Sequence, residues 1–210
     1  KPEKQKEKSR ETMDIYAPIA DRLGISKVKV ELDDLSLRYL EPEAYKELGE
    51  QFNEIKEYKE NFVKDIMEEV DKRLLENNIK ATIDGRVKHL FSIYRKMVKQ
   101  HKSLDQIYDL FAVRIIVDSI KDCYAALGII HEIYKPIPGR FKDYISVPKK
   151  NMYQSIHTTL IGPNGTPFEV QIRTWDMHRV AEFGIAAHWA YKEQSYKGKK
   201  KAVVVKDDKL

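Results

Sequence analysis

The strongest constraint on the fold is a β-hairpin that the sequence specifies between residues 155 and 173. Two strand-like runs, 155–161 and 167–173, are separated by Gly162-Pro163-Asn164-Gly165, which is a string of turn-forming residues. The second run alternates apolar and polar side chains: Phe168, Val170 and Ile172 against Glu169, Gln171 and Arg173. Because neighbouring side chains in a strand point to opposite faces, one face of this hairpin is expected in the core and the other in a polar environment.

The predicted secondary structure changes at Asn77-Asn78 from helices alone to alternating strands and helices. Apolar residues recur at helical spacing from residue 11 to about 77, with a stop at Gly24, an N-cap at Ser26 and a long charged helix from Pro42 to Asn77. Beyond it, the patterns predict strands at 79–87, 110–117 and 144–147 and helices at 89–100, 120–134 and 175–191. We therefore expect an α+β fold, a mixed β-sheet flanked by helices and preceded by an N-terminal helical segment. The expected divisions are 1–77, 78–193 and a basic tail at 194–210.

Composition narrows the class of protein. The 210 residues include one cysteine, Cys123, which excludes a disulfide framework or a cysteine-rich zinc site and fits a cytoplasmic location. No apolar run approaches the roughly 18 residues that a membrane span needs, so we expect no membrane contact. The chain begins at Lys1 without a signal-peptide pattern, which suggests a fragment of a longer protein.

The net charge of +5 is unevenly distributed. Residues 86–102 carry six Lys or Arg and no acid, and residues 135–150 carry five against the single Asp143. The remainder of the body is acidic, apart from the two basic ends. This segregation indicates two cationic segments focused on one cleft, as a polyphosphate substrate requires, rather than a broad basic face for a nucleic-acid duplex.

Three groups of residues are candidates for chemistry. Lys88, Ser92 and Lys96 follow Arg86 at the start of a predicted helix, where backbone amides also favour anions, although a solvated basic face would look similar. Asp109 and Glu169 are candidate Mg²⁺ ligands, and the simpler alternative is that Glu169 pairs with Arg173.

Tyr153 is the third candidate, because Asn151 and His157 flank it. An exposed aromatic ring among amides and cations could stack on a nucleobase, whereas a single tyrosine at a strand start is more often a core residue. His157 is likewise more often structural than catalytic. The sequence contains no Walker motif and no nucleophile elbow. It also lacks histidines or cysteines at the spacing of a zinc site.

Five ordered strings resemble the synthetase domain of the RelA/SpoT family, which makes guanosine tetra- and pentaphosphate. They begin at Gly85 (GRVKH), Asp109 (DLFAVR), Gly139 (GRFKDY), Asn151 (NMYQSIH) and Glu169 (EVQIRT), and residues 14–24 resemble the helical connector of long members. One departure is Met152, where many members have glycine.

The resemblance implies a nucleotidyltransferase-like fold and transfer of the β,γ-pyrophosphate of ATP to the 3′-hydroxyl of GDP or GTP, with Mg²⁺. It also implies roles for individual residues. Arg86, Arg114, Lys88, Ser92 and Lys96 would bind ATP, and Asp109 and Glu169 would hold the metal, with Glu169 as ligand or base. The acceptor nucleotide would be bound by Arg140, Lys142, Lys149, Asn151, Tyr153 and His157.

Two other functions remain open at this point. An RNA nucleotidyltransferase would need a close Asp-x-Asp or Asp-x-Glu pair, and a non-catalytic nucleotide- or RNA-binding module would need only the cations. The basic Arg140–Asp143 loop is typical of bifunctional members, so we expect a long parent protein with a separate hydrolase domain. Any ribosome contact would use segments outside this sequence.

Overall fold

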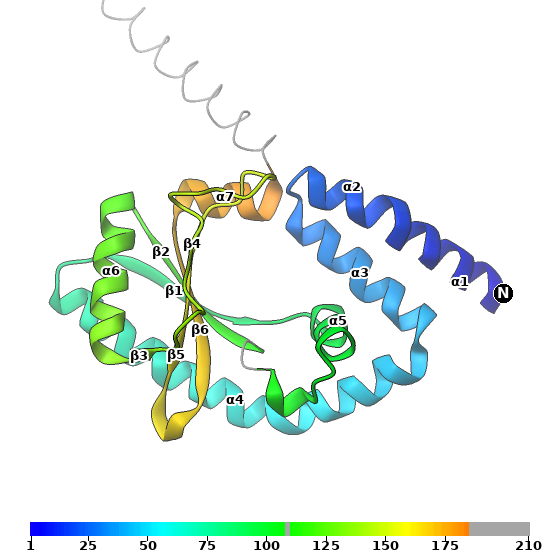
Figure 1. The fold of residues 1–210 in the computed structure, drawn as a ribbon, viewed down its shortest axis with the longest axis horizontal. Helices are drawn as coiled ribbons and strands as arrows, with labels where there is room; N and C mark the ends of the chain where they lie inside the picture. The colour runs from blue at the N-terminus through cyan, green and yellow to red at the C-terminus, as the bar shows by residue number, and fades with distance from the viewer. Residues whose placement is uncertain (108–109, 185–210) are drawn as a thin grey trace, which may run out of the picture.

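A computed structural model describes residues 1–107 and 110–184. Helices fill the first part of the chain: α1 Pro2–Glu11, a π-helical turn Thr12–Tyr16, α2 Ala17–Arg22, α3 Ser26–Leu40 and α4 Pro42–Glu76. The arm formed by α1 and α2 lies beside α3, and α4 then runs along the sheet (Figure 1). The predicted helical segment is confirmed, but it starts before residue 11, and Ile25 rather than Ser26 occupies the N-cap position of α3.

The sheet contains six strands in the described ranges: β1 Ala81–Val87, β2 Phe111–Val117, β3 Lys135–Pro136, β4 Lys142–Asp143, β5 Ile156–Ile161 and β6 Pro167–Thr174. Their order is β1-β2-β6-β5-β3, and β4 pairs with β5 next to β3. The pair β2–β6 is parallel and the other pairs are antiparallel, so the sheet is mixed, as predicted. Three further helices complete the fold: α5 Leu90–Gln100, α6 Ile120–Ile133 and α7 Trp175–Phe183.

The predicted hairpin is β5–β6, with Ile156 opposite Ile172 and Ile161 opposite Pro167. Its turn is a short 3₁₀ segment, Pro163–Gly165, in which Asn164 and Gly165 have positive φ angles of 56° and 72°. A Cβ atom at Gly162 would lie 2.9 Å from the Phe62 ring, so glycine lets the hairpin approach α4 closely.

Two predicted elements are corrected. Residues 144–147 form a turn rather than a strand, because the Asp143 carboxylate accepts hydrogen bonds from the backbone N–H groups of Ile145 (2.9 Å) and Ser146 (3.0 Å). The strand lies two residues earlier, as β4. The helix predicted for 175–191 ends at Phe183, where Gly184 takes a φ of 79°; residues 185–191 and the tail 194–210 lie outside the described residues.

Side-chain alternation gives the sheet two different faces. One packs against α4 and α6, where Val70, Leu74, Val113, Val170 and Ile172 are completely buried. Burying each such side chain contributes roughly 1.5–3 kcal/mol to folding. The apolar side of α4 contributes to this core although its outer side is charged. Among the described residues, no helix is both long enough and apolar enough to cross a membrane.

The other face carries a polar row in register across five strands. Asp84 on β1 lies opposite Arg114 on β2, Arg114 beside Gln171 on β6, and Gln171 opposite His157 on β5, which pairs in turn with Lys142 on β4. The alternation predicted for β6 is therefore confirmed, and it places the functional candidates on the face that α4 and α6 leave open.

Candidate functional site

A cleft of about 640 Å³ lies between the polar face of the sheet, α7 and the beginning of α3. This volume is typical of a site for a small ligand. Six of the residues singled out in the sequence line it: Arg86, Arg114, Lys149, Asn151, Tyr153 and His157. The fold therefore brings both cationic segments, residues 86–102 and 135–150, to the same place.

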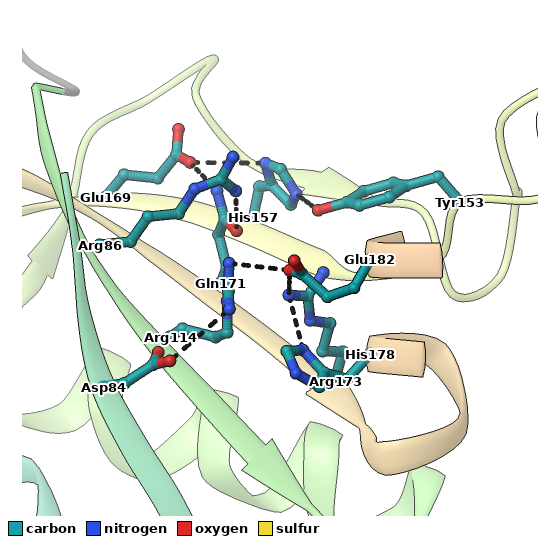
Figure 2. Close-up of polar contacts among 10 residues, drawn as sticks. All are labelled: Asp84, Arg86, Arg114, Tyr153, His157, Glu169, Gln171, Arg173, His178 and Glu182. Atoms are coloured by element: carbon teal, nitrogen blue, oxygen red, sulfur yellow. Dashed lines mark hydrogen bonds and ion pairs between the residues drawn. The ribbon is translucent and has the colours of Figure 1, made fainter. Parts of the chain in front are cut away.

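Arg86, Arg114 and Arg173, from β1, β2 and β6, form an arginine floor in this cleft (Figure 2). Arg114 lies 3.6 Å from Asp84 and 3.4 Å from Glu182, and the same Glu182 oxygen lies 3.4 Å from Arg173. Arg173 is only 1% exposed, and burial lowers its pKa to about 10, so it remains charged at neutral pH. Within the described structure the buried Nε atoms of Arg114 and Arg173 have no hydrogen-bond partner, so the donors of these two guanidinium groups are not all satisfied by the protein.

Arg173 also fixes the state of His178. Its Nη2 atom lies 2.9 Å from His178 Nδ1, and because a guanidinium only donates, Nδ1 must accept and the ring proton must be on Nε2. Burial and the neighbouring guanidinium lower the pKa of His178. The α7 helix is thus attached to the arginine floor by a neutral histidine and a carboxylate.

A second polar chain runs from Tyr153 through His157 to Glu169 (Figure 2). The Tyr153 hydroxyl lies 2.8 Å from His157 Nε2, and His157 Nδ1 lies 3.6 Å from a Glu169 oxygen. Burial, reinforced by Lys149 and Arg173, lowers the pKa of His157 to about 3, so the ring is neutral. The carboxylate favours the proton on Nδ1, and Tyr153 then donates to Nε2.

The alternative in which Glu169 simply pairs with Arg173 is not what the structure shows. Four residues along a strand separate them by roughly 13 Å, and each has another partner. Glu169 accepts a hydrogen bond of 2.7 Å from the Gln171 amide, and Gln171 accepts one of 3.2 Å from Arg86. Glu169 is therefore joined to the arginine floor through an amide rather than neutralised by it.

The loop that holds Tyr153 is shaped by its neighbours. The Lys149 ammonium lies 4.8 Å from the Tyr153 ring centroid and 4.6 Å from that of Tyr144, which is a cation–π contact. Asn151 accepts from the Tyr153 backbone N–H at 3.2 Å and donates to the Asp21 carbonyl at 3.5 Å. Met152 has a φ of 64°, in the left-handed region that favours glycine.

Glu169 lines a second, smaller pocket, and it contacts Gln171 and His157, which line the cleft. The lining of the smaller pocket also includes Lys96 from α5 and Arg140, so two more of the predicted residues line the same pocket as this carboxylate. Lys142 lies on β4 opposite His157, and Ser92 lies in the first turn of α5. Lys88, whose backbone N–H donates to the Leu110 carbonyl at 2.8 Å, lies in the β1–α5 connection.

The predicted attraction of anions to the α5 amides needs correction. The backbone N–H of Phe91 donates to Asp34 Oδ1 at 2.8 Å, so a carboxylate of the protein already occupies this helix end. Phosphate groups would instead meet the side chains of α5.

Of the two predicted Mg²⁺ ligands, the structure describes Glu169. Asp109 lies outside the described residues, and the described ranges contain no cluster of three metal-ligating side chains. Glu169 has one oxygen engaged by Gln171, and its second has no described partner. Mg²⁺ uses one or two carboxylates together with substrate oxygens and water, so Glu169 fits as one ligand of such a site.

Several cleft residues had no place in the sequence prediction. Three of them could have been predicted. Side-chain alternation along β1 places Asp84 on the polar face, and the four-residue spacing of His178 and Glu182 places both on one side of α7. The helical segment adds four more, Asp21, Ser26, Lys27 and Val30, for which the sequence carried no signal.

Comparisons with known proteins show the family of the chain. Residues 85–196 match a family model described as a region found in RelA / SpoT proteins. The chain is 50% identical over 201 residues to a GTP pyrophosphokinase of Streptomyces coelicolor, covering 96% of this chain and 24% of that protein. It is 50% identical over 192 residues to the bifunctional (p)ppGpp synthase/hydrolase RelA of Mycobacterium tuberculosis, covering 91% of this chain and 26% of that one.

The chain thus spans about a quarter of the length of these relatives. Among solved structures, the small alarmone synthetase 1 of Bacillus subtilis bound to its product pppGpp superposes with a TM-score of 0.51 at 20% identity, covering 72% of this chain and 83% of that one. This likeness supports the fold class, a mixed β-sheet flanked by helices.

Proposed function

Because the chain belongs to the RelA/SpoT family, we propose that it transfers the β,γ-pyrophosphate of ATP to the ribose 3′-hydroxyl of GDP or GTP. The products are AMP and guanosine tetra- or pentaphosphate. The observation that carries the proposal is the polar face of the sheet, where three arginines and lysines of both cationic segments lie around Glu169, while Asp84 and Glu182 pair with arginines of the floor. Cations in excess over acids suit two polyphosphate substrates that react beside one metal-binding group.

We assign the donor nucleotide to the side of the site formed by β1, β2 and α5. Arg86 and Arg114 would flank adenine, and Lys88, Ser92 and Lys96 would hold the ATP phosphates. Lys96 supports this assignment because it lines the same small pocket as Glu169, next to which the reacting phosphate must lie.

We assign the acceptor nucleotide to the side formed by β4, β5 and the 149–153 loop. Tyr153 would stack on guanine, and Arg140, Lys142, Lys149, Asn151 and His157 would position the ribose and phosphates. The Tyr153 hydroxyl contacts His157, and the Lys149 ammonium lies 4.8 Å from the centroid of its ring, so these two contacts would hold the ring in place for stacking.

Glu169 has two proposed duties at the centre. It would hold Mg²⁺ together with Asp109, or it would accept the proton of the 3′-hydroxyl. A bound Mg²⁺ neutralises the phosphate oxygens that gain charge during transfer. The new bond joins the 3′-oxygen to the β-phosphorus, and the bond from that phosphorus to the α–β bridging oxygen breaks, so AMP leaves with the bridging electrons.

His157 would act as a neutral spacer between Tyr153 and Glu169. Its pKa of about 3 keeps it uncharged, so it does not compete with the metal for the carboxylate. Gln171 would orient Glu169 by its 2.7 Å hydrogen bond. Both residues position groups, as catalysis by alignment and charge neutralisation requires.

The two other functions receive less support. An RNA nucleotidyltransferase needs paired strand carboxylates, whereas the polar face has Glu169 with the neutral Gln171 beside it. A non-catalytic binding module would not need a carboxylate oriented toward the smaller pocket. The cytoplasm, where both nucleotides occur, is the proposed location, and the buried thiol of Cys123 fits a reducing compartment.

The test is incubation of the purified chain with ATP, GDP and Mg²⁺, followed by separation of the nucleotides. We expect AMP together with a guanosine carrying a 3′-pyrophosphate. Release of inorganic pyrophosphate with incorporation of AMP into RNA would support the nucleotidyltransferase alternative, and binding without turnover would support the non-catalytic one. We further propose that hydrolysis of the product belongs to another part of the intact protein, so this chain should not degrade it.

A further inference from the structure

The first turn of α5 is capped from a distant part of the chain. His89 occupies the N-cap position, and its own side chain makes no capping hydrogen bond. Instead Asp34, on α3, accepts the Phe91 backbone N–H through Oδ1 at 2.8 Å, across 57 residues of sequence. A carboxylate at a helix start stabilises it both as a hydrogen-bond acceptor and through the helix dipole.

The same carboxylate also contacts the residue before the helix. Asp34 Oδ2 lies 3.6 Å from His89 Nδ1, and His89 lines the large cleft. One side chain of the helical segment therefore contacts the start of α5 at two positions: the backbone of Phe91 in the first turn and the ring of His89 at the N-cap. Two contacts fix the direction in which α5 leaves the sheet, which a single contact would not.

Asp34 has no comparable role within its own helix. Its neighbour Asp33 is buried and pairs with Lys29 at 2.5 Å inside α3, so Asp33 serves that helix. The Asp34 side chain contacts α5 instead, and among the described residues its partners are Phe91 and His89.

The capped turn contains Ser92 and is followed by Lys96, two of the side chains that we assign to the ATP phosphates. Ser92 follows Phe91 directly, and Lys96 lies about one turn later, in the pocket that Glu169 also lines. A change in the orientation of the first turn would displace both. Misplacement by about 1 Å is enough to lower the rate of an aligned reaction strongly.

We propose that Asp34 is a positioning residue for the donor nucleotide: from the helical segment it caps and orients α5 so that Ser92 and Lys96 face the ATP phosphates. This inference rests on the proposed function, because it assumes that α5 binds ATP. It makes the N-terminal helical segment a structural part of the donor site rather than a connector alone.

The test compares Asp34→Ala and Asp34→Asn with the control Glu31→Ala, which removes an exposed carboxylate from the same helix. Amide hydrogen exchange followed by NMR reports the Phe91 N–H without any need for activity. Steady-state synthesis reports KM for ATP and for GDP, and titration with a non-hydrolysable ATP analogue reports donor binding directly.

We expect Asp34→Ala to expose the Phe91 amide to exchange and to weaken ATP by about fivefold, the equivalent of one typical helix cap, with KM for GDP unchanged. Asp34→Asn should restore most of the ATP affinity, because asparagine caps helices about as well as aspartate, and Glu31→Ala should behave like the parent.

The inference is overturned if Phe91 loses protection while ATP affinity stays unchanged, since the cap would then be structural only. Equal weakening of both nucleotides would also overturn it, as would Asp34→Asn being as impaired as Asp34→Ala. A parent chain that synthesises nothing contradicts the proposed function instead, and the exchange and analogue-binding measurements still decide the role of Asp34.

Discussion

Replacing Glu182 by glutamine should destabilise the protein although the side chain keeps its shape. Glu182 is the carboxylate that Arg114 and Arg173 share at 3.4 Å, and Arg173 is almost completely buried. Removing one partner of a fully buried ion pair costs about 3–5 kcal/mol. Because Glu182 is 27% exposed and an amide oxygen can still accept one hydrogen bond, we expect a loss of about 2 kcal/mol.

Thermal unfolding followed by circular dichroism measures this loss. For a chain of this size each kcal/mol shifts Tm by roughly 2–4 °C, so Tm should fall by about 4–8 °C. The matched control is Glu50→Gln, which removes an exposed carboxylate that pairs with Lys46 at 3.8 Å and should cost about 0.5 kcal/mol or less.

Inorganic pyrophosphate provides the second arm of the experiment. If the arginine floor binds phosphate, the anion should raise the Tm of Glu182→Gln more than that of the parent, because it replaces the missing charge. A Tm for Glu182→Gln equal to that of the control would refute the account of Glu182 as the counter-charge of two arginines. Equal stabilisation of parent and variant by pyrophosphate would place the anion elsewhere.

Four further predictions concern the chemistry. Glu169→Gln should keep the fold and nucleotide binding but reduce turnover on the order of 10³-fold, and near-normal turnover of a folded variant would remove Glu169 from the centre. Tyr153→Ala should weaken the guanosine substrate by about 1–3 kcal/mol and ATP much less, as measured by titration of each nucleotide; equal weakening would mean a packing role. The pKa of His157 is lowered to about 3 in the folded protein, so as the pH falls below 6.5 the unfolded chain takes up a proton at this residue before the folded chain does. The free energy of unfolding should therefore carry no penalty from His157 above pH 6.5 and should decrease as the pH falls toward 3. Unfolding across pH should show that His157→Asn lacks this decline, and parallel profiles for variant and parent would contradict the lowered pKa. Converting Arg140 to Glu and Lys142 to Asp should shift the Mg²⁺ dependence of synthesis to higher concentration, and an unchanged curve would refute an electrostatic role of the loop.

The part of the site that lies on the sheet could be predicted because strand alternation is a short-range property. Once Phe168, Val170 and Ile172 are placed in the core, Glu169 and Gln171 must face the other way, and the structure confirms this. The arginine floor follows from the same rule applied to β1 and β2.

The remaining part depends on contacts that no local pattern reveals. Asp34 and Asp21 belong to a segment that looks like any solvated helical hairpin, yet they contact Phe91 and Asn151 through tertiary packing. The turn after Asp143 was missed because the side chain of that residue competes with the strand ladder for backbone N–H groups.

The polar row on the sheet depends on the two-residue alternation of side chains along each strand. Asp84, Arg114, Gln171 and His157 stand side by side because four strands keep their register. Inserting or deleting one residue within β6 would turn Gln171 toward α4 and α6 and bring a core side chain out into the cleft. Such a change would therefore damage the fold and the site together. Sequence drift in these strands is therefore confined to substitution, and changes of length must fall in the turns, such as the one at residues 162–165, that connect them.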